Sequence, residues 1–247
     1  MQCPGQDNRY WDGSAVFEAA CPECGQTVEF FKDDSTRPCT NCGHRLMNPK
    51  MDFGCAAYCP YAKQCLGDLP PQLLAHKQGL LKEQVAVEMK RYFGNDFKRI
   101  GHAGRVARHA EEIGQAEGAN DAVLMIASFL HDIGIKEAER KHNSTAARYQ
   151  HEEGPPIARR ILERLDAPTG LIDEVCDIIG HHHSPRPEET VNFKCLYDAD
   201  LIVNLEEEQK ERERPTPPEH LAKIIARSFL TDSGRALAAK VLCPPAA

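Results

Sequence analysis

The chain has 247 residues, of which 41% are hydrophobic, and a formal net charge of −7. This length and composition allow one domain of ordinary size and a smaller one, with enough apolar residues to form a core. Neither half of the chain is basic, so we do not expect duplex nucleic acid as a partner. No stretch reaches the roughly 18 apolar residues of a membrane-spanning helix, so we expect no membrane association.

The N-terminus and the cysteines together indicate the compartment. The first residues, Met-Gln-Cys-Pro-Gly-Gln-Asp, lack the apolar core of a signal peptide, so we expect a cytoplasmic protein. Eight of the 11 cysteines lie before residue 66, in metal-ligand spacings. Without an export signal, metal binding explains such cysteines better than disulfides do. We therefore predict a cysteine-rich metal-binding module over residues 1–68 and a separate domain over residues 69–247.

Two Cys-x-x-Cys-Gly motifs, separated by 14 residues, form the clearest pattern in the N-terminal module. Each such turn directs two sulfur atoms at one centre, and four thiolates make the closed tetrahedral site of structural zinc. The alternating residues Gln26 to Lys32 predict a strand between the motifs. The module resembles a zinc ribbon; free thiols or a redox pair are the alternatives. The expected zinc ligands are Cys21, Cys24, Cys39 and Cys42.

A second group of cysteines follows the ribbon motifs. Cys55, Cys59 and Cys65 need a fourth ligand, and Cys3 is the remaining cysteine in this half. Four thiolates suit either zinc or an iron–sulfur cluster, and the irregular spacing favours the cluster. The alternative is that one or two of these cysteines only pack against their neighbours.

The chain after the linker Leu66–Pro71 has helical periodicity and no persistent strand pattern. The charged stretch Ile135–Asn143 is predicted to be a loop over the functional site. The pair Pro155-Pro156 is predicted to disturb the helix in which it lies. The predicted helices span Leu74–Phe93, Asp96 to about Glu117, Asn120–His131, about Ser144 to Leu165, Thr169 to near Gly180, Phe193–Gln209, and one or two within Pro217–Leu242.

Metal-binding residue types recur on these helices. His131 and Asp132 end an apolar helix and are followed by Ile133 and Gly134, which we expect to end that helix in a left-handed conformation. The further candidates are His102, His151, His181, His182, His183, Asp198 and Asp200. This order resembles the HD superfamily of metal-dependent phosphohydrolases, and His-Asp-Ile-Gly resembles its HDIG variant. The resemblance covers Leu73–Leu242 and implies a mainly α protein, with an all-helical HD domain after the ribbon-like module.

The resemblance also implies the metal ligands. One ion would be held by His102, His131, Asp132 and Asp200. Asp132 would bridge to a second ion held by His151, His181 and His182, with His183 exposed. We expect Asp198 to orient a ligand histidine through its far nitrogen. Imidazoles and carboxylates suit Mn, Fe, Co, Ni or Zn.

The implied activity is hydrolysis of a phosphate ester or anhydride by a metal-activated water, in a nucleotide or a related small molecule. Asp132 would act at the catalytic centre, and Arg105 and Lys136 would bind the phosphate. Arg105 could instead pair with a carboxylate inside the fold. The alternatives are an HD-domain sensor or scaffold that binds a protein partner through the N-terminal module, and an HD oxygenase with two irons.

Overall fold

The computed structural model describes residues 16–31, 34, 36–50, 71–212 and 216–243. The chain divides into two compact units, residues 1–77 and 78–247, which are described separately below. The predicted second cysteine site, formed by Cys3, Cys55, Cys59 and Cys65, lies outside the described residues and stays a prediction. The predicted linker Leu66–Pro71 also lies outside the described residues, except for Pro71, which is the first residue of a helix.

The N-terminal unit is built from two antiparallel hairpins. Strand β1 (Val16–Ala20) pairs with β2 (Thr27–Phe31), and β3 (Thr36–Pro38) pairs with β4 (Arg45–Met47). The alternation in β2 buries Val28 and Phe30 on one face, as the sequence predicts. With Leu46 and two cysteines, these residues form a small core. So small a core is marginal by itself, and a metal is the usual additional source of stability.

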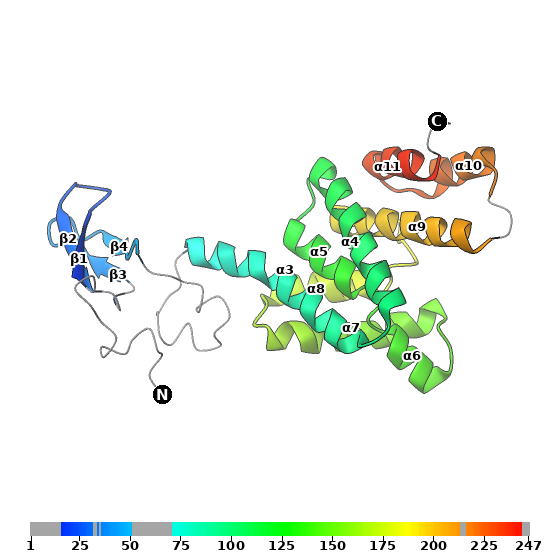
Figure 1. Ribbon diagram of the computed structural model, residues 1–247, viewed down its shortest axis with the longest axis horizontal. Coiled ribbons are helices and arrows are strands. Elements are labelled where there is room, and N and C mark those ends of the chain that lie inside the picture. The colour runs from blue at the N-terminus through cyan, green and yellow to red at the C-terminus, as the bar shows by residue number, and fades with distance from the viewer. Residues whose placement is uncertain (1–15, 32–33, 35, 51–70, 213–215, 244–247) are drawn as a thin grey trace. The chain divides into compact units, whose positions relative to one another are not determined.

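The second unit is helical throughout the part of the chain that the structure describes (Figure 1). Helix α4 packs against both α5 and α9, α7 packs against α8, and α11 packs against α9 and α4. Among the described residues, no helix is both long and apolar enough to cross a bilayer. The first described helix begins in the N-terminal unit, since the boundary between the units falls at residue 78. The helices are α3 (Pro71–Phe93), α4 (Phe97–Glu117), α5 (Asp121–Leu130), α6 (Ile135–His142), α7 (Ala147–Arg164), α8 (Thr169–Ile179), α9 (Val191–Glu211), α10 (Pro218–Ser228) and α11 (Asp232–Leu242).

Helix α6 corrects the predicted loop over residues 135–143. Ala138 is the one buried residue within this helix, so the sequence has almost no apolar periodicity to indicate it. Ion pairs of Glu137 with Arg140 and Lys141, at the spacings that bring helical side chains together, stabilise it instead. Asn143 ends the helix with a left-handed φ of 49°.

Gly134 also differs from the prediction, because its φ of −74° is right-handed. What requires glycine here is the close approach of another backbone. A Cβ atom at this position would lie 2.6 Å from the carbonyl oxygen of Gln150 and 2.6 Å from the amide nitrogen of Gly154. Gly134 therefore lets the turn after His131 and Asp132 rest directly on helix α7, which carries His151.

Helix α7 continues through Pro155 and Pro156. Because proline has no amide hydrogen, the carbonyls of His151 and Glu152 have no helical donor four residues later. The two prolines thus disturb the hydrogen bonding of α7, as predicted, but the helix continues through them as one element.

Candidate metal centres

Four predicted ligands from three parts of the helical unit converge on one point. Asp200 comes from α9, His102 from α4, and His131 and Asp132 from the turn after α5. His102 Nε2 lies 3.3 Å from His131 Nε2 and 3.0 Å from Asp200 Oδ1. Asp132 Oδ2 lies 3.5 Å from His131 Nε2. These four residues are called the first ligand set, and three of them, His102, His131 and Asp200, are buried.

The end of a helix orients His131. Carbonyls in the last turn of a helix have no partner within that helix, so they are free to accept other hydrogen bonds. His131 Nδ1 lies 2.8 Å from the Ser128 carbonyl oxygen in the last turn of α5. Since a carbonyl can only accept, Nδ1 carries a hydrogen, and Nε2 faces the centre, where it can hold either a proton or a metal cation.

The first ligand set stabilises positive charge. Burial alone lowers the pKa of His131, but the charges of Asp132 and Asp200 outweigh it and raise this pKa to about 9. Burial raises the pKa of Asp132, yet its histidine neighbours hold that pKa well below the usual range. The pKa of Asp200 is lowered for the same reason, with His102 as its strongest histidine partner. A cation is the species that this arrangement favours.

A second ligand set consists of His151, His182 and His183, which offer ring nitrogens within 4.8 Å of one another. Burial lowers the pKa of His151 and of His183 to about 4, so both rings are neutral at pH 7, the form that binds metals. Asp132 lies between the two sets, because its Oδ1 is 3.7 Å from His182 Nε2 while its Oδ2 faces His131.

His182 shows that these residues fit a metal. Its Nδ1 donates to the Ile179 carbonyl at 2.9 Å, in the last turn of α8, so Nε2 carries the lone pair. This Nε2 atom is buried and has no hydrogen-bond partner among the described residues. A buried polar atom without a partner is costly. A cation coordinated by Nε2 would remove that cost.

His181, predicted for the second ion, does not join the second ligand set. Its ring stacks on Phe193 with the centroids 4.5 Å apart, and its Nε2 lies 2.9 Å from Glu189 Oε1. His183 is exposed, as expected, and it also takes the place of His181, because its ring offers a nitrogen within 4.8 Å of those of His151 and His182. The side chains diverge because the three histidines lie in a turn after α8 rather than in a helix.

The two predicted phosphate-binding side chains have other partners. Lys136 donates from Nζ to the Tyr92 carbonyl at 2.9 Å and lies over the Tyr92 ring. Arg105 donates to Glu207 Oε1, which is half-buried, so it has the carboxylate partner that the sequence left open as the alternative.

The expectation that Asp198 orients a ligand histidine is wrong. Asp198 is fully buried and accepts hydrogen bonds from the Leu230 amide at 2.8 Å and from the Thr231 amide at 2.8 Å and hydroxyl at 2.6 Å. It joins α9 to the segment between α10 and α11.

Sequence reasoning missed two residues near the first ligand set. Glu207 Oε1 lies 3.2 Å from His102 Nδ1. It follows Asp200 by two helical turns, a spacing that places both on one face of α9 and could have revealed it. Arg99 precedes His102 by three residues. Burial lowers its pKa, but Glu139 and, to a lesser extent, the charges of Asp96 and Asp132 raise it overall. Arg99 also forms two hydrogen bonds with Glu139 of α6.

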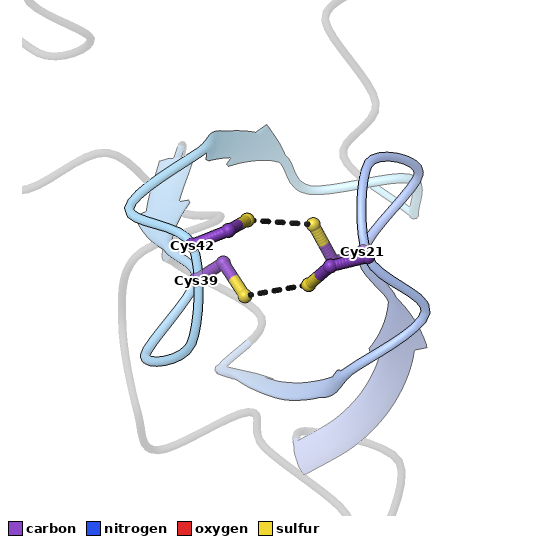
Figure 2. A group of neighbouring side chains, drawn as sticks. Cys21, Cys39 and Cys42 are labelled. Atoms are coloured by element: carbon purple, nitrogen blue, oxygen red, sulfur yellow. Dashed lines mark hydrogen bonds between the residues drawn. The ribbon is translucent and has the colours of Figure 1, made fainter.

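The N-terminal unit holds a separate group of four sulfur atoms from the two predicted motifs (Figure 2). The Cys21 and Cys42 sulfurs lie 3.6 Å apart, and so do those of Cys24 and Cys39. Four thiolates about 2.3 Å from a tetrahedral zinc lie about 3.8 Å apart, close to these separations. The backbone amide of Gln26 is the main cause that lowers the pKa of Cys24 to about 6. The His44 backbone lowers the pKa of Cys42, but the neighbouring cysteine sulfurs outweigh it and raise that pKa to about 12. The four sulfurs can therefore all be thiolates only if a cation offsets their charge.

The two turns that carry these cysteines are alike. The Gly25 amide donates to the Cys21 carbonyl at 2.8 Å, and the Gly43 amide donates to the Cys39 carbonyl at 2.9 Å. Both glycines have a φ of 74°, which other residues rarely adopt. The glycine after each motif is thus required by its turn.

Comparison with known proteins concerns the helical unit. Residues 99–229 match the HD domain family. Among solved structures, the chain is similar to a predicted HD superfamily hydrolase from an uncultured Thermotogales bacterium. The identity is 21% and the TM-score 0.48, over 64% of this chain and 83% of that one. No curated protein matches the chain.

Proposed function

Because this chain belongs to the HD domain family, we propose that its helical unit is a metal-dependent phosphohydrolase acting on a phosphate ester or anhydride. The observation that supports this most directly is the position of Asp132 between the two ligand sets. A carboxylate between two groups of imidazoles suits two divalent transition metals, such as Mn, Fe, Co, Ni or Zn. The His-Asp-Ile-Gly sequence supports placement in the HDIG group.

The chain's own residues would divide the work of hydrolysis. A divalent metal bound here would supply a water of lowered pKa and neutralise phosphate oxygens. Ser128 and Ile179 orient His131 and His182 through their carbonyls, so those rings need no rearrangement when a metal binds. Asp132 and Asp200 supply the negative charge that holds cations in a partly buried site.

Arg99 is the basic residue that we assign to the substrate phosphate, in place of Lys136 and Arg105. It lies on α4 one turn before His102, within reach of the charge of Asp132, and a substrate phosphate would have to compete there with Glu139 and Asp96, which both pair with this guanidinium. Guanidinium groups suit phosphate because they can donate two parallel hydrogen bonds. A nucleotide or a related small molecule is the substrate class that we propose.

Replacing a ligand tests this proposal. With Mn²⁺ supplied, His131→Ala and Asp132→Ala should each lower phosphatase activity on p-nitrophenyl phosphate and nucleotides more than about 100-fold. Loss of an outer partner of a metal ligand already costs roughly 10- to 100-fold. His109→Ala is the matched control, since His109 lies on the face of α4 that contacts Glu206 and belongs to neither ligand set.

Circular dichroism should show that all three variants keep their helices. Wild-type turnover in either ligand variant would contradict the proposed function. Activity that requires oxygen, with iron as the bound metal, would favour the oxygenase instead.

A further inference from the structure

We propose that Glu207 is a positioning residue that fixes His102 as a metal ligand, and that Arg105 holds Glu207 in place. The inference rests on the proposed metal centre and names a residue that sets its affinity. Glu207 belongs to neither ligand set, and it lies in the charged stretch Glu206–Arg214, which the sequence alone indicates as a solvated helix end and loop.

The contact between Glu207 and His102 fixes which ring nitrogen is free. Glu207 Oε1 lies 3.2 Å from His102 Nδ1, and the other ring nitrogen, Nε2, lies 3.0 Å from Asp200 Oδ1. Both carboxylates can accept a hydrogen from the ring. Asp200 is itself a predicted metal ligand, so a bound cation would replace the hydrogen between Nε2 and Asp200, whereas Glu207 belongs to neither ligand set and keeps the hydrogen on Nδ1. The lone pair of Nε2 then points toward Asp200 and His131, as coordination requires.

His102 needs a side-chain acceptor because of its place in the fold. His131 and His182 follow the ends of α5 and α8, where last-turn carbonyls accept their Nδ1 hydrogens. His102 lies in the middle of α4, where the nearby carbonyls already accept helical hydrogen bonds. The acceptor must therefore come from a neighbouring element, and α9 supplies it.

A carboxylate acceptor differs from a carbonyl because it carries a full negative charge. Hydrogen bonding to a carboxylate makes the ligating nitrogen more basic, which strengthens its bond to a cation. The charge of Glu207 and its ability to accept a hydrogen bond thus contribute separately. Glu207→Gln removes the charge alone, and Glu207→Leu removes both with little change in size.

Arg105 restrains the carboxylate from the same helix that carries His102. Its guanidinium donates to Glu207 Oε1, the same oxygen that faces His102 Nδ1. Because Arg105 follows His102 by three residues, both lie on the face of α4 that packs against α9. A free glutamate has several rotamers, and the arginine favours the one that reaches the histidine.

The neighbouring residue provides a matched control. Glu206 lies on the same turn of α9 and is 3.8 Å from the ring of His109, which belongs to neither ligand set. Glu206→Gln therefore removes the same charge, in the same helix, without touching the contact to His102.

The test is Mn²⁺ binding to the full-length protein after removal of metals with a chelator. Mn²⁺ is chosen because the thiolates of the N-terminal unit are soft ligands that it disfavours. We expect calorimetry to show Mn²⁺ affinity falling several-fold in Glu207→Gln and about 10- to 100-fold in Glu207→Leu. Glu206→Gln should match the wild type, and the electron paramagnetic resonance spectrum of bound Mn²⁺ should change only in the Glu207 variants.

Each outcome decides the matter. Wild-type affinity in Glu207→Leu, or an equal loss in Glu206→Gln, would overturn the positioning role while leaving the metal centre intact. A wild-type protein that binds no Mn²⁺ would overturn the proposed centre and this inference together. If circular dichroism shows that Glu207→Leu is unfolded, the Mn²⁺ affinity of the nearly isosteric Glu207→Gln is compared with that of the wild type instead. Wild-type affinity in Glu207→Gln would then overturn the positioning role.

Discussion

Two aspartates on α9 serve different parts of the protein, although only one residue separates them. Neighbours at that spacing point to nearly opposite sides of a helix, since each residue turns it by about 100°. Asp200 faces His102 and the candidate metal centre. Asp198 faces the start of α11 and accepts three hydrogen bonds from Leu230 and Thr231.

This difference predicts opposite results for the two alanine variants. Asp198→Ala should lower the free energy of unfolding by about 3 kcal/mol, because it leaves buried donors without an acceptor. It should leave Mn²⁺ affinity nearly unchanged. Asp200→Ala should instead abolish tight Mn²⁺ binding. Urea denaturation and calorimetry measure the two effects, and a loss of Mn²⁺ affinity in Asp198→Ala that equals the loss in Asp200→Ala would contradict the division.

At the scale of elements, the turn after α5 rests on α7 through two glycines, Gly134 and Gly154. We expect Gly134→Ala to lower the free energy of unfolding by roughly 1–3 kcal/mol or more, because its Cβ would press on backbone atoms that cannot rotate away. Gly104→Ala in α4 is the control. Its Cβ would meet nothing within 4 Å, so the better helix propensity of alanine should stabilise the protein by up to about 1 kcal/mol.

Thermal unfolding of the two glycine variants checks this prediction. Equal shifts in melting temperature would show that the close approach of α6 and α7 does not matter for stability.

The sequence predicts helices well where an apolar face repeats and a cap is present. Asp96 and Asn120, where two of the predicted helices begin, cap those helices, because their side chains accept hydrogen bonds from the amides of Arg99 and Val123. Helix α6 was missed because ion pairs rather than apolar packing stabilise it.

The sequence predicts which residue types form the candidate site and their order along the chain. It does not predict the direction in which each side chain points. The members of the first ligand set were implied by the resemblance to the HD superfamily and not by spacing, because they come from three separate parts of the helical unit that only its packing brings together. The histidine triplet lies in a turn, where no periodicity says which ring faces which neighbour. The choice between His181 and His183 therefore depends on contacts with Glu189, Phe193 and His151 that sequence spacing does not contain.

For the whole molecule, the two units offer metal sites that share no ligand. We therefore predict that Cys39→Ser releases one zinc ion per chain from the full-length protein and leaves Mn²⁺ binding in the helical unit unchanged. Tetrathiolate sites bind zinc through all four sulfurs, so one substitution should suffice.

His131→Ala is the reciprocal variant and should retain that zinc. Elemental analysis after purification measures both. The prediction fails if Cys39→Ser retains the wild-type amount of zinc, or if His131→Ala loses the same ion.

The first ligand set also has a topological consequence. His102 and Asp200 are 98 residues apart in the chain, yet their side chains lie 3.0 Å from each other. A cation held by both would be a reversible cross-link closing a loop of that length. In the unfolded chain, closing a loop of about 100 residues costs on the order of 4–5 kcal/mol in chain entropy. The packing of α4 against α9 already offsets this entropy loss in the folded protein without a metal. A bound ion would therefore stabilise a loop that the fold has already closed.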